Sequence, residues 1–283
     1  MPEAPNCAQL LYLACGSRSL QIQALYAAYS AVAYKSGVNL AIHVFSDSPA
    51  SFRVLENQIC VHAVTPAQVK SWRGPGKYAY RMKIAALSEL SSRFSESPIL
   101  FVDSDTFFID ELGKVLSRID SRHAVLHRKE YPVLTCPTGQ LQRFRRRMGK
   151  FRFRGSFVDL NADMWNSGVI GLHPSQFHLL NTVLAFIDAI SPKYNKQLVE
   201  QYAVSYFLQK NVEVRAADDC VFHYWQQKEE YQSAIEPKLQ AWTERPLGEA
   251  LAELRANRIV LPPFQPRHGW VRRLRDRILQ EPE

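Results

Sequence analysis

The chain has 283 residues, enough for one large α/β domain or for one domain with a small addition. With 46% apolar and 22% charged residues, its composition is that of a globular protein and excludes a disordered chain. The formal net charge of +8 is compatible with nucleic acid, an anionic membrane surface or a phosphorylated substrate as partner, and it does not choose among them.

The five cysteines do not form a disulfide or zinc pattern. Their number is odd, no CxxC occurs, and most lie in apolar stretches, which indicates reduced, buried thiols in a cytosolic protein. The N-terminus has no basic region ahead of its short apolar run, so it does not resemble a signal peptide. The longest apolar stretch, residues 24–34, is too short to span a bilayer. We therefore expect a cytoplasmic protein.

The first half of the chain alternates strand and helix patterns. Residues 19–37 carry apolar residues at helical spacing, with Ser19 as the expected N-cap and Gly37 as the stop. A second helix is expected over 78–94. Short apolar runs predict strands over 9–15, 39–47, 60–65 and 99–102. This alternation predicts a mostly parallel sheet covered on both faces by helices.

The second half continues the pattern less regularly. Further strands are expected over 123–128 and 167–173, helices over about 175–190 and 197–210, and two short strands within 212–225. Residues 132–157 are polar and very basic and predict a loop or a short helix. We expect one domain over residues 1–262 and a basic C-terminal tail over 263–283.

Two aspartates, Asp103 and Asp105, follow the apolar strand 99–102 directly. In an open α/β sheet, ligands bind at the carboxyl ends of the strands. Two carboxylates at i and i+2 of an extended chain point the same way and can hold Mg²⁺ or Mn²⁺, with a nucleoside diphosphate completing the shell. A solvated turn is the alternative. A phosphatase of the haloacid-dehalogenase type would need Thr where Phe107 stands.

Five motifs in order resemble a GT-A glycosyltransferase, most closely the glycogenin and lipopolysaccharide galactosyltransferase group known as glycosyltransferase family 8. They are "YAYRMKIAAL" (78–87), "VDSDTFF" (102–108), "WNSGVIGL" (165–172), "VEQYAVSYFL" (199–208) and "FHYWQQK" (222–228). The resemblance implies a Rossmann-like nucleotide-diphospho-sugar transferase fold, with a mostly parallel central sheet flanked by helices, and a metal-dependent transferase activity.

The resemblance also implies a set of ligand contacts. Asp103, Asp105 and His223 would hold the metal, and Lys228 would contact the diphosphate, where a fixed cation stabilises the leaving group. Taken alone, His223 could be a core histidine and Lys228 a surface lysine. Gly16, in the loop "ACGSRS" that opens the first helix, would border the base and ribose of the nucleotide.

Two positions on the second helix compete for the site. Arg81 and Lys83 are two apart, so they point about 200° away from each other and at most one faces the site. The resemblance favours Arg81 as the sugar or phosphate contact and leaves Lys83 on the surface.

Four further residues are expected near the sugar. Asn166 can contact a sugar hydroxyl or cap a turn, and Asp163 is expected to contact the donor sugar. Glu200 and Gln201 stand where the family has Asp-Gln beside the anomeric carbon. A helix-surface role for Glu200 is the alternative.

We therefore expect a hexosyltransferase that moves a hexose from a nucleotide sugar, a UDP-sugar in the first instance, to a hydroxyl acceptor such as a cell-surface or lipid-linked glycan. Retention of the anomeric configuration is what the resemblance implies. An inverting enzyme would need a carboxylate base, such as Asp163 or Glu200. The alternatives are a nucleotidyltransferase that makes a sugar nucleotide, and a non-catalytic protein that binds nucleic acid or nucleotide.

Two basic segments suggest a further partner. Residues 143–154 mix cations with phenylalanines, and residues 270–279 place apolar residues at helical spacing opposite arginines. The first fits an anionic acceptor or an anionic membrane surface, with a solvated face as the alternative. The second fits a helix at a membrane interface, with packing on the domain as the alternative. We expect peripheral association with the inner face of the membrane and no nucleic-acid partner, although such interleaving can also bind nucleic acid.

Overall fold

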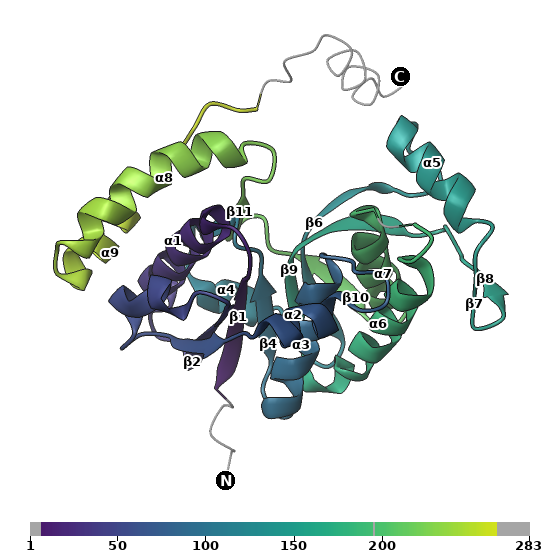
Figure 1. Cartoon of the computed structure of the whole chain (residues 1–283), viewed down its shortest axis with the longest axis horizontal. Coiled ribbons are helices and arrows are strands. Elements are labelled where there is room, and N and C mark those ends of the chain that lie inside the picture. Colours follow the sequence, from purple (N-terminus) through teal and green to yellow (C-terminus); the bar gives the residue numbers. More distant parts are fainter. Residues whose placement is uncertain (1–6, 195, 265–283) are drawn as a thin grey trace.

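The structure is a computed structural model and describes residues 7–194 and 196–264. Its centre is a seven-stranded sheet in the order β10-β6-β9-β4-β1-β2-β3 (Figure 1). The strands are β1 (Ala8–Ala14), β2 (Leu40–Ser46), β3 (Cys60–Ala63), β4 (Ile99–Val102), β6 (His123–Pro132), β9 (Asp163–Leu172) and β10 (Glu213–Ala216).

The sheet is mostly parallel, as predicted. The parallel pairs are β1 with β2, β1 with β4, β2 with β3, and β6 with β10, whereas β9 runs antiparallel to both β4 and β6. The strand expected over 167–173 corresponds to β9. It is longer than expected because it begins at Asp163, and it runs opposite to its two neighbours. Its reversal brings residues 166–168 beside the end of β4, where the Asp103 amide donates to the Gly168 carbonyl at 2.8 Å.

Helices cover both faces of the sheet (Figure 1). α1 (Arg18–Tyr34), α4 (Leu112–Leu116), α8 (Lys228–Thr243) and α9 (Leu247–Ala256) pack on one face. α2 (Pro66–Arg73), α3 (Arg81–Arg93), α5 (Gly139–Met148), α6 (His178–Ile190) and α7 (Leu198–Gln209) pack on the other. Two 3₁₀ turns, η1 (Pro49–Leu55) and η2 (Pro174–Gln176), complete the helical elements of the described residues.

Strand β4 shows why the apolar runs in the sequence are continuous. Leu100 and Val102 enter one core while Ile99 and Phe101 enter the other. Because successive side chains of a strand point to opposite faces, a sheet covered on both sides needs apolar residues at every position.

The N-cap of helix α1 lies two residues before Ser19, the expected cap. Ser17 is the N-cap, and its side chain accepts the Leu20 amide. Gly16 precedes it with φ +126°, a conformation that favours glycine. The Gly16 amide donates to Asp47 at 2.8 Å, which ties the loop to the end of β2.

Two small sheets flank the central one. β5 (Thr106–Phe108) pairs antiparallel with β11 (Val221–His223), and β7 (Arg152–Phe153) pairs antiparallel with β8 (Ser156–Phe157). The basic segment 132–157, expected to be a loop or a short helix, contains the short helix α5 followed by a hairpin that was not predicted.

Residues 228–256 carry no predicted element, yet they form α8 and α9. Pro237 lies inside α8, where a proline removes a backbone hydrogen bond and obscures the helical pattern. The segment 270–279, expected to form an amphipathic helix, lies outside the described residues. Within the described part of the chain, no helix has the length and apolar character to cross a bilayer.

The five cysteines are free, in agreement with reduced thiols. Cys136 and Cys220 are buried, but Cys60 is exposed on β3 at the edge of the sheet. The expectation that the thiols are buried is therefore only partly correct, because an edge strand leaves one side of its residues open to solvent.

Candidate functional site

A cavity of about 640 Å³ opens where β1 and β4 end, on the side of the sheet toward which these parallel strands run. That volume lies within the range of small-molecule sites. The loop after β1, the aspartate segment after β4 and the middle of β9 all contribute. Its lining includes Gly16, Ser17, Arg73, Tyr80, Lys83, Asp103, Asp105, Asn166, Ser167, Gly168, Glu200, His223, Trp225 and Lys228.

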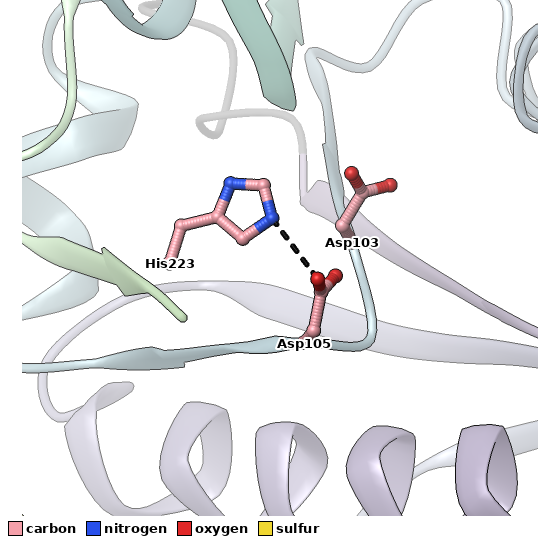
Figure 2. Close-up of side chains that lie close together, drawn as sticks. All are labelled: Asp103, Asp105 and His223. Atoms are coloured by element: carbon pink, nitrogen blue, oxygen red, sulfur yellow. Dashed lines mark ion pairs between the residues drawn. The ribbon is translucent and has the colours of Figure 1, made fainter. Parts of the chain in front are cut away.

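Three of the predicted residues meet as a candidate metal centre (Figure 2). Asp103, Asp105 and His223 each offer a ligand atom, and these atoms lie within 4.8 Å of one another. The pairing of β5 with β11 aligns His223 with Thr106 and so brings the imidazole beside Asp105. His223 Nε2 lies 3.3 Å from Asp105 Oδ2, and Asp105 is 4% exposed.

This group fits a divalent cation. Two ligands on opposite sides of an ion, at about 2.1 Å each, lie about 4.2 Å apart, which is compatible with the observed cluster. Two carboxylates are hard ligands, and an imidazole suits Mn²⁺ better than Mg²⁺. The geometry is therefore that of half a coordination shell, with the cavity side open to further oxygen ligands.

His223 is oriented by a chain of hydrogen bonds. Its Nδ1 donates to Asn166 Oδ1 at 3.0 Å, and Asn166 Nδ2 donates to Glu130 at 3.1 Å. Glu130 also accepts a bond from Gln201 Nε2 at 2.7 Å. Because Nδ1 is engaged, the Nε2 atom that faces Asp105 is available as a ligand. Asn166 and Gln201 thus support the metal cluster, although they were expected near the sugar.

Gly168 is needed beside this histidine. A Cβ at that position would lie 2.4 Å from both Cε1 and Nδ1 of His223. We expect Gly168→Ala to displace the imidazole and weaken Mn²⁺ binding about 10- to 100-fold, the usual cost of disturbing the support of a metal ligand. Calorimetric titration with Mn²⁺ measures this.

Gly171→Ala is the matched control, because it lies on the same strand but would crowd Ile119 and Val125 in the core. It should lower the thermal midpoint and leave Mn²⁺ affinity unchanged. Equal Mn²⁺ affinity in the two glycine variants would contradict the role assigned to Gly168.

Lys228 and Lys83 balance the negative charge of the aspartates. Lys228 Nζ lies 2.7 Å from Asp105, and Lys83 Nζ lies 3.3 Å from Asp103. Burial raises the pKa of Asp105, but His223 and Lys228 outweigh this and hold that pKa well below its usual range. Burial also lowers the pKa of Lys83, but Asp103 and Glu200 raise it above its ordinary value. Asp105 therefore stays ionised and Lys83 stays protonated at neutral pH.

The choice of Arg81 over Lys83 is wrong in the structure. Arg81 turns away from the cavity and makes a bidentate ion pair with Asp188 of α6, at 2.6 and 2.9 Å. Lys83, expected at the surface, is 7% exposed and lines the cavity. The prediction that the two side chains point in opposite directions from α3 is confirmed. The residue that faces the cavity is Lys83, and not Arg81 as expected.

Glu200 lines the same cavity but is 1% exposed. Its Oε2 accepts from Ser167 Oγ at 3.1 Å and lies 3.5 Å from Lys83 Nζ, while its Oε1 has no hydrogen-bond partner among the described residues. Burial raises the pKa of Glu200 to about 7, because attraction to Lys83 offsets only part of the lost solvation. A surface role for this residue is therefore wrong.

This pKa predicts a pH-dependent stability. The carboxyl titrates near 4.5 in an unfolded chain and near 7 in the fold, so between these values the folded state binds the extra proton and stability falls as pH rises. We expect Glu200→Gln to remove this slope, a difference of roughly 3 kcal/mol between pH 4 and pH 8. Urea unfolding of both proteins across that range measures it, with Glu249→Gln as an exposed control. Parallel profiles for wild type and Glu200→Gln would contradict it.

Asp163 does not join this cavity. It begins β9, pairs with Lys129 at 2.7 Å, and lines a second cavity of about 340 Å³ together with Tyr206 and Lys210. Asp163 and Asn166 are three residues apart on an extended strand, which separates them by about 10 Å. The expected contact of Asp163 with the donor sugar therefore has no support in the geometry.

Several residues of the cavity were not predicted. Besides Lys83, they include Tyr80 and Trp225, which are 42% and 37% exposed, while Glu130 lies behind Asn166 without lining the cavity. Tyr80 precedes Arg81 and Trp225 follows His223 by two residues, inside the motifs quoted above. Their positions in those motifs could have indicated that they lie at the site. Glu130 lies in the strand β6 and carried no signal of its own.

The chain matches no protein-family model, and a comparison with curated proteins gives no significant match. The case for a function therefore depends on the geometry of the site. That geometry combines a cavity at the carboxyl ends of parallel strands, three convergent metal-ligand side chains, and two lysines.

Proposed function

We propose that the protein is a metal-dependent GT-A glycosyltransferase that moves a hexose from a nucleotide sugar, UDP-sugar being the first choice, to a hydroxyl acceptor such as a cell-surface or lipid-linked glycan. The observation that carries the proposal is the convergence of Asp103, Asp105 and His223 in a cavity of about 640 Å³. The mostly parallel sheet flanked by helices and the five ordered motifs support the same assignment.

Asp103, Asp105 and His223 would hold Mn²⁺ or Mg²⁺, which supplies charge neutralisation to the two phosphates of the donor. Lys228 lies beside the cluster and is half exposed on the cavity side. Its ammonium would stabilise the charge that develops on the departing nucleoside diphosphate. Ser17 and Gly16, at the start of α1, would border the nucleotide.

Lys83 and Glu200 form the inner wall of the cavity, below the aspartates. Lys83 donates to Asp103 and holds it in place, and Ser167 orients Glu200. As the resemblance implies, Glu200 would lie near the reacting carbon and the anomeric configuration would be retained. The exposed rings of Tyr80 and Trp225 at the cavity offer apolar faces on which a sugar ring can pack.

The test is turnover with a donor panel. UDP-, GDP- and ADP-hexoses are incubated with Mn²⁺ and simple saccharide acceptors, and the release of nucleoside diphosphate is followed with and without a chelator. We expect release from one donor class only when metal is present. Release of pyrophosphate from a nucleoside triphosphate and a sugar phosphate, with no turnover of any nucleotide sugar, would overturn the proposal in favour of a nucleotidyltransferase.

A further inference from the structure

The segment 139–157 presents a basic surface at the periphery of the molecule, formed by α5 and the β7–β8 hairpin (Figure 1). α5 buries Leu141, Phe144 and Met148, at the spacing of one helix face, so its arginines lie on the outer face. We define the α5–β8 basic surface by six exposed cations and one exposed ring: Arg143, Arg146, Arg147, Lys150, Arg152, Arg154 and Phe157.

These six cations have no acidic partners. Over residues 7–194 and 196–264, no ion pair joins any of them to a carboxylate. Some exposed cations elsewhere are paired, as Lys114 is with Asp110 and Lys210 with Asp159, and others such as Arg53 are not, but the six named here lie close together in one segment. A cluster of like charges repels itself, so an anionic partner outside the protein would stabilise it.

An apolar group is exposed among these charges. Phe157 is 59% exposed and lies under the Arg152 guanidinium, with the guanidinium carbon 4.0 Å from the ring centroid. The hairpin turns through Arg154 and Gly155, both with positive φ, which is typical of the tightest hairpin loops. Basic residues beside an exposed aromatic ring are typical of surfaces that bind the headgroup region of a bilayer.

The other phenylalanines of this segment are less exposed, since Phe151 and Phe153 are partly buried against the core. Phe144 is fully buried, and Phe153 packs edge-on against Phe186 and Phe207. The cations line neither of the two cavities described above. Binding of a nucleic-acid strand uses a groove with rings on which successive bases stack. A surface that lines neither cavity and has Phe157 as its exposed ring favours a lipid bilayer over a nucleic acid as partner.

We propose that the α5–β8 basic surface docks the protein on a bilayer that contains anionic lipids. The arginines of α5 contact the headgroup phosphates, and Phe157 enters the boundary between headgroups and acyl chains. This docking is independent of the metal cluster, and it would hold the protein at the surface where lipid-linked acceptors lie.

Vesicle sedimentation of the full chain tests the proposal. Vesicles of phosphatidylcholine alone are compared with vesicles that also contain about 30% phosphatidylglycerol, at about 50 mM and about 300 mM salt. We expect binding only to the anionic vesicles and weaker binding at the higher salt. In Arg143→Gln/Arg146→Gln/Arg147→Gln, affinity should fall about 100-fold, at roughly five-fold per cation.

Glutamine retains the helical propensity of α5, and circular dichroism verifies that the triple variant is folded. The matched control removes three exposed arginines elsewhere, as Arg53→Gln/Arg122→Gln/Arg258→Gln, and should bind within about five-fold of wild type. Asp105→Asn should bind vesicles like wild type even if it loses every metal-dependent function.

Three results would overturn the proposal. Equal losses in the two triple variants would mean that net charge alone, and not this surface, drives binding. Full binding by the α5 triple variant would assign the contact to another part of the chain. Binding of a nucleic-acid oligomer without binding to anionic vesicles would identify a different partner.

Discussion

Asp105→Asn is expected to abolish metal-dependent nucleotide binding. The variant keeps the shape of a side chain that is 4% exposed but removes the charge shared by His223 and Lys228. Loss of an outer partner alone costs a metal site about 10- to 100-fold in affinity, so loss of a ligand should cost at least about 100-fold. Titration of Mn²⁺, with the free ion followed by electron paramagnetic resonance, measures the change.

Asp110→Asn is the matched control for that variant. Asp110 lies on the same segment, is partly exposed, and pairs with Lys114 alone among the described cations. It should bind Mn²⁺ like wild type. Tight Mn²⁺ binding by Asp105→Asn, in a variant that melts like wild type, would contradict the assignment of Asp105 as a ligand.

Lys83→Met should be the most destabilising single change at the site. Lys83 Nζ lies within 3.5 Å of Asp103, Glu200 and Ser167, and methionine fills its volume without the charge. Removing one partner of a buried ion pair costs about 3–5 kcal/mol, because it leaves buried charge uncompensated. At pH 5 Glu200 carries a proton and no longer needs a cationic partner. The stability lost on removing Lys83 should therefore be larger at pH 8 than at pH 5. Urea unfolding at both values measures it.

The double variant Lys83→Met/Glu200→Gln tests whether the unpaired charge of Glu200 causes the loss of stability in Lys83→Met. If the unpaired carboxylate is responsible, the second substitution should recover a large part of the lost stability, and the double-mutant cycle should give a coupling of at least about 1 kcal/mol. Lys210→Met, which breaks an exposed pair with Asp159, should leave stability unchanged. Additive effects of Lys83→Met and Glu200→Gln would refute the buried pair.

The place of Asp103 and Asp105 in the candidate site could be predicted from the sequence because its signal is local. An apolar strand that runs into Asp103 and Asp105 fixes where both carboxylates lie, since ligands gather at the carboxyl ends of parallel strands. The covered, mostly parallel sheet followed from runs such as residues 99–102, whose side chains enter both cores. His223 depended on the resemblance, because nothing local distinguishes a ligand from a core histidine.

The features that could not be predicted depend on partners far apart in the chain. Arg81 is withdrawn from the cavity by Asp188, which lies on α6 and has no visible relation to it in the sequence. Lys83 had a usable signal, because a lysine within the apolar run of α3 is buried only if it is paired. The direction of β9, and with it the place of Asp163, is decided by sheet pairing and not by local propensity.

Thermal unfolding of the wild-type protein with nucleotides tests the central claim most directly. The midpoint is measured with UDP, GDP, ADP and their hexose derivatives, each with and without Mn²⁺, because a ligand of the native state raises it by mass action. We predict that one nucleotide class raises the midpoint only when Mn²⁺ is present, and that Asp105→Asn loses the effect. If no nucleotide raises the midpoint with Mn²⁺, or if Asp105→Asn responds like wild type, the cavity is not a metal–nucleotide site.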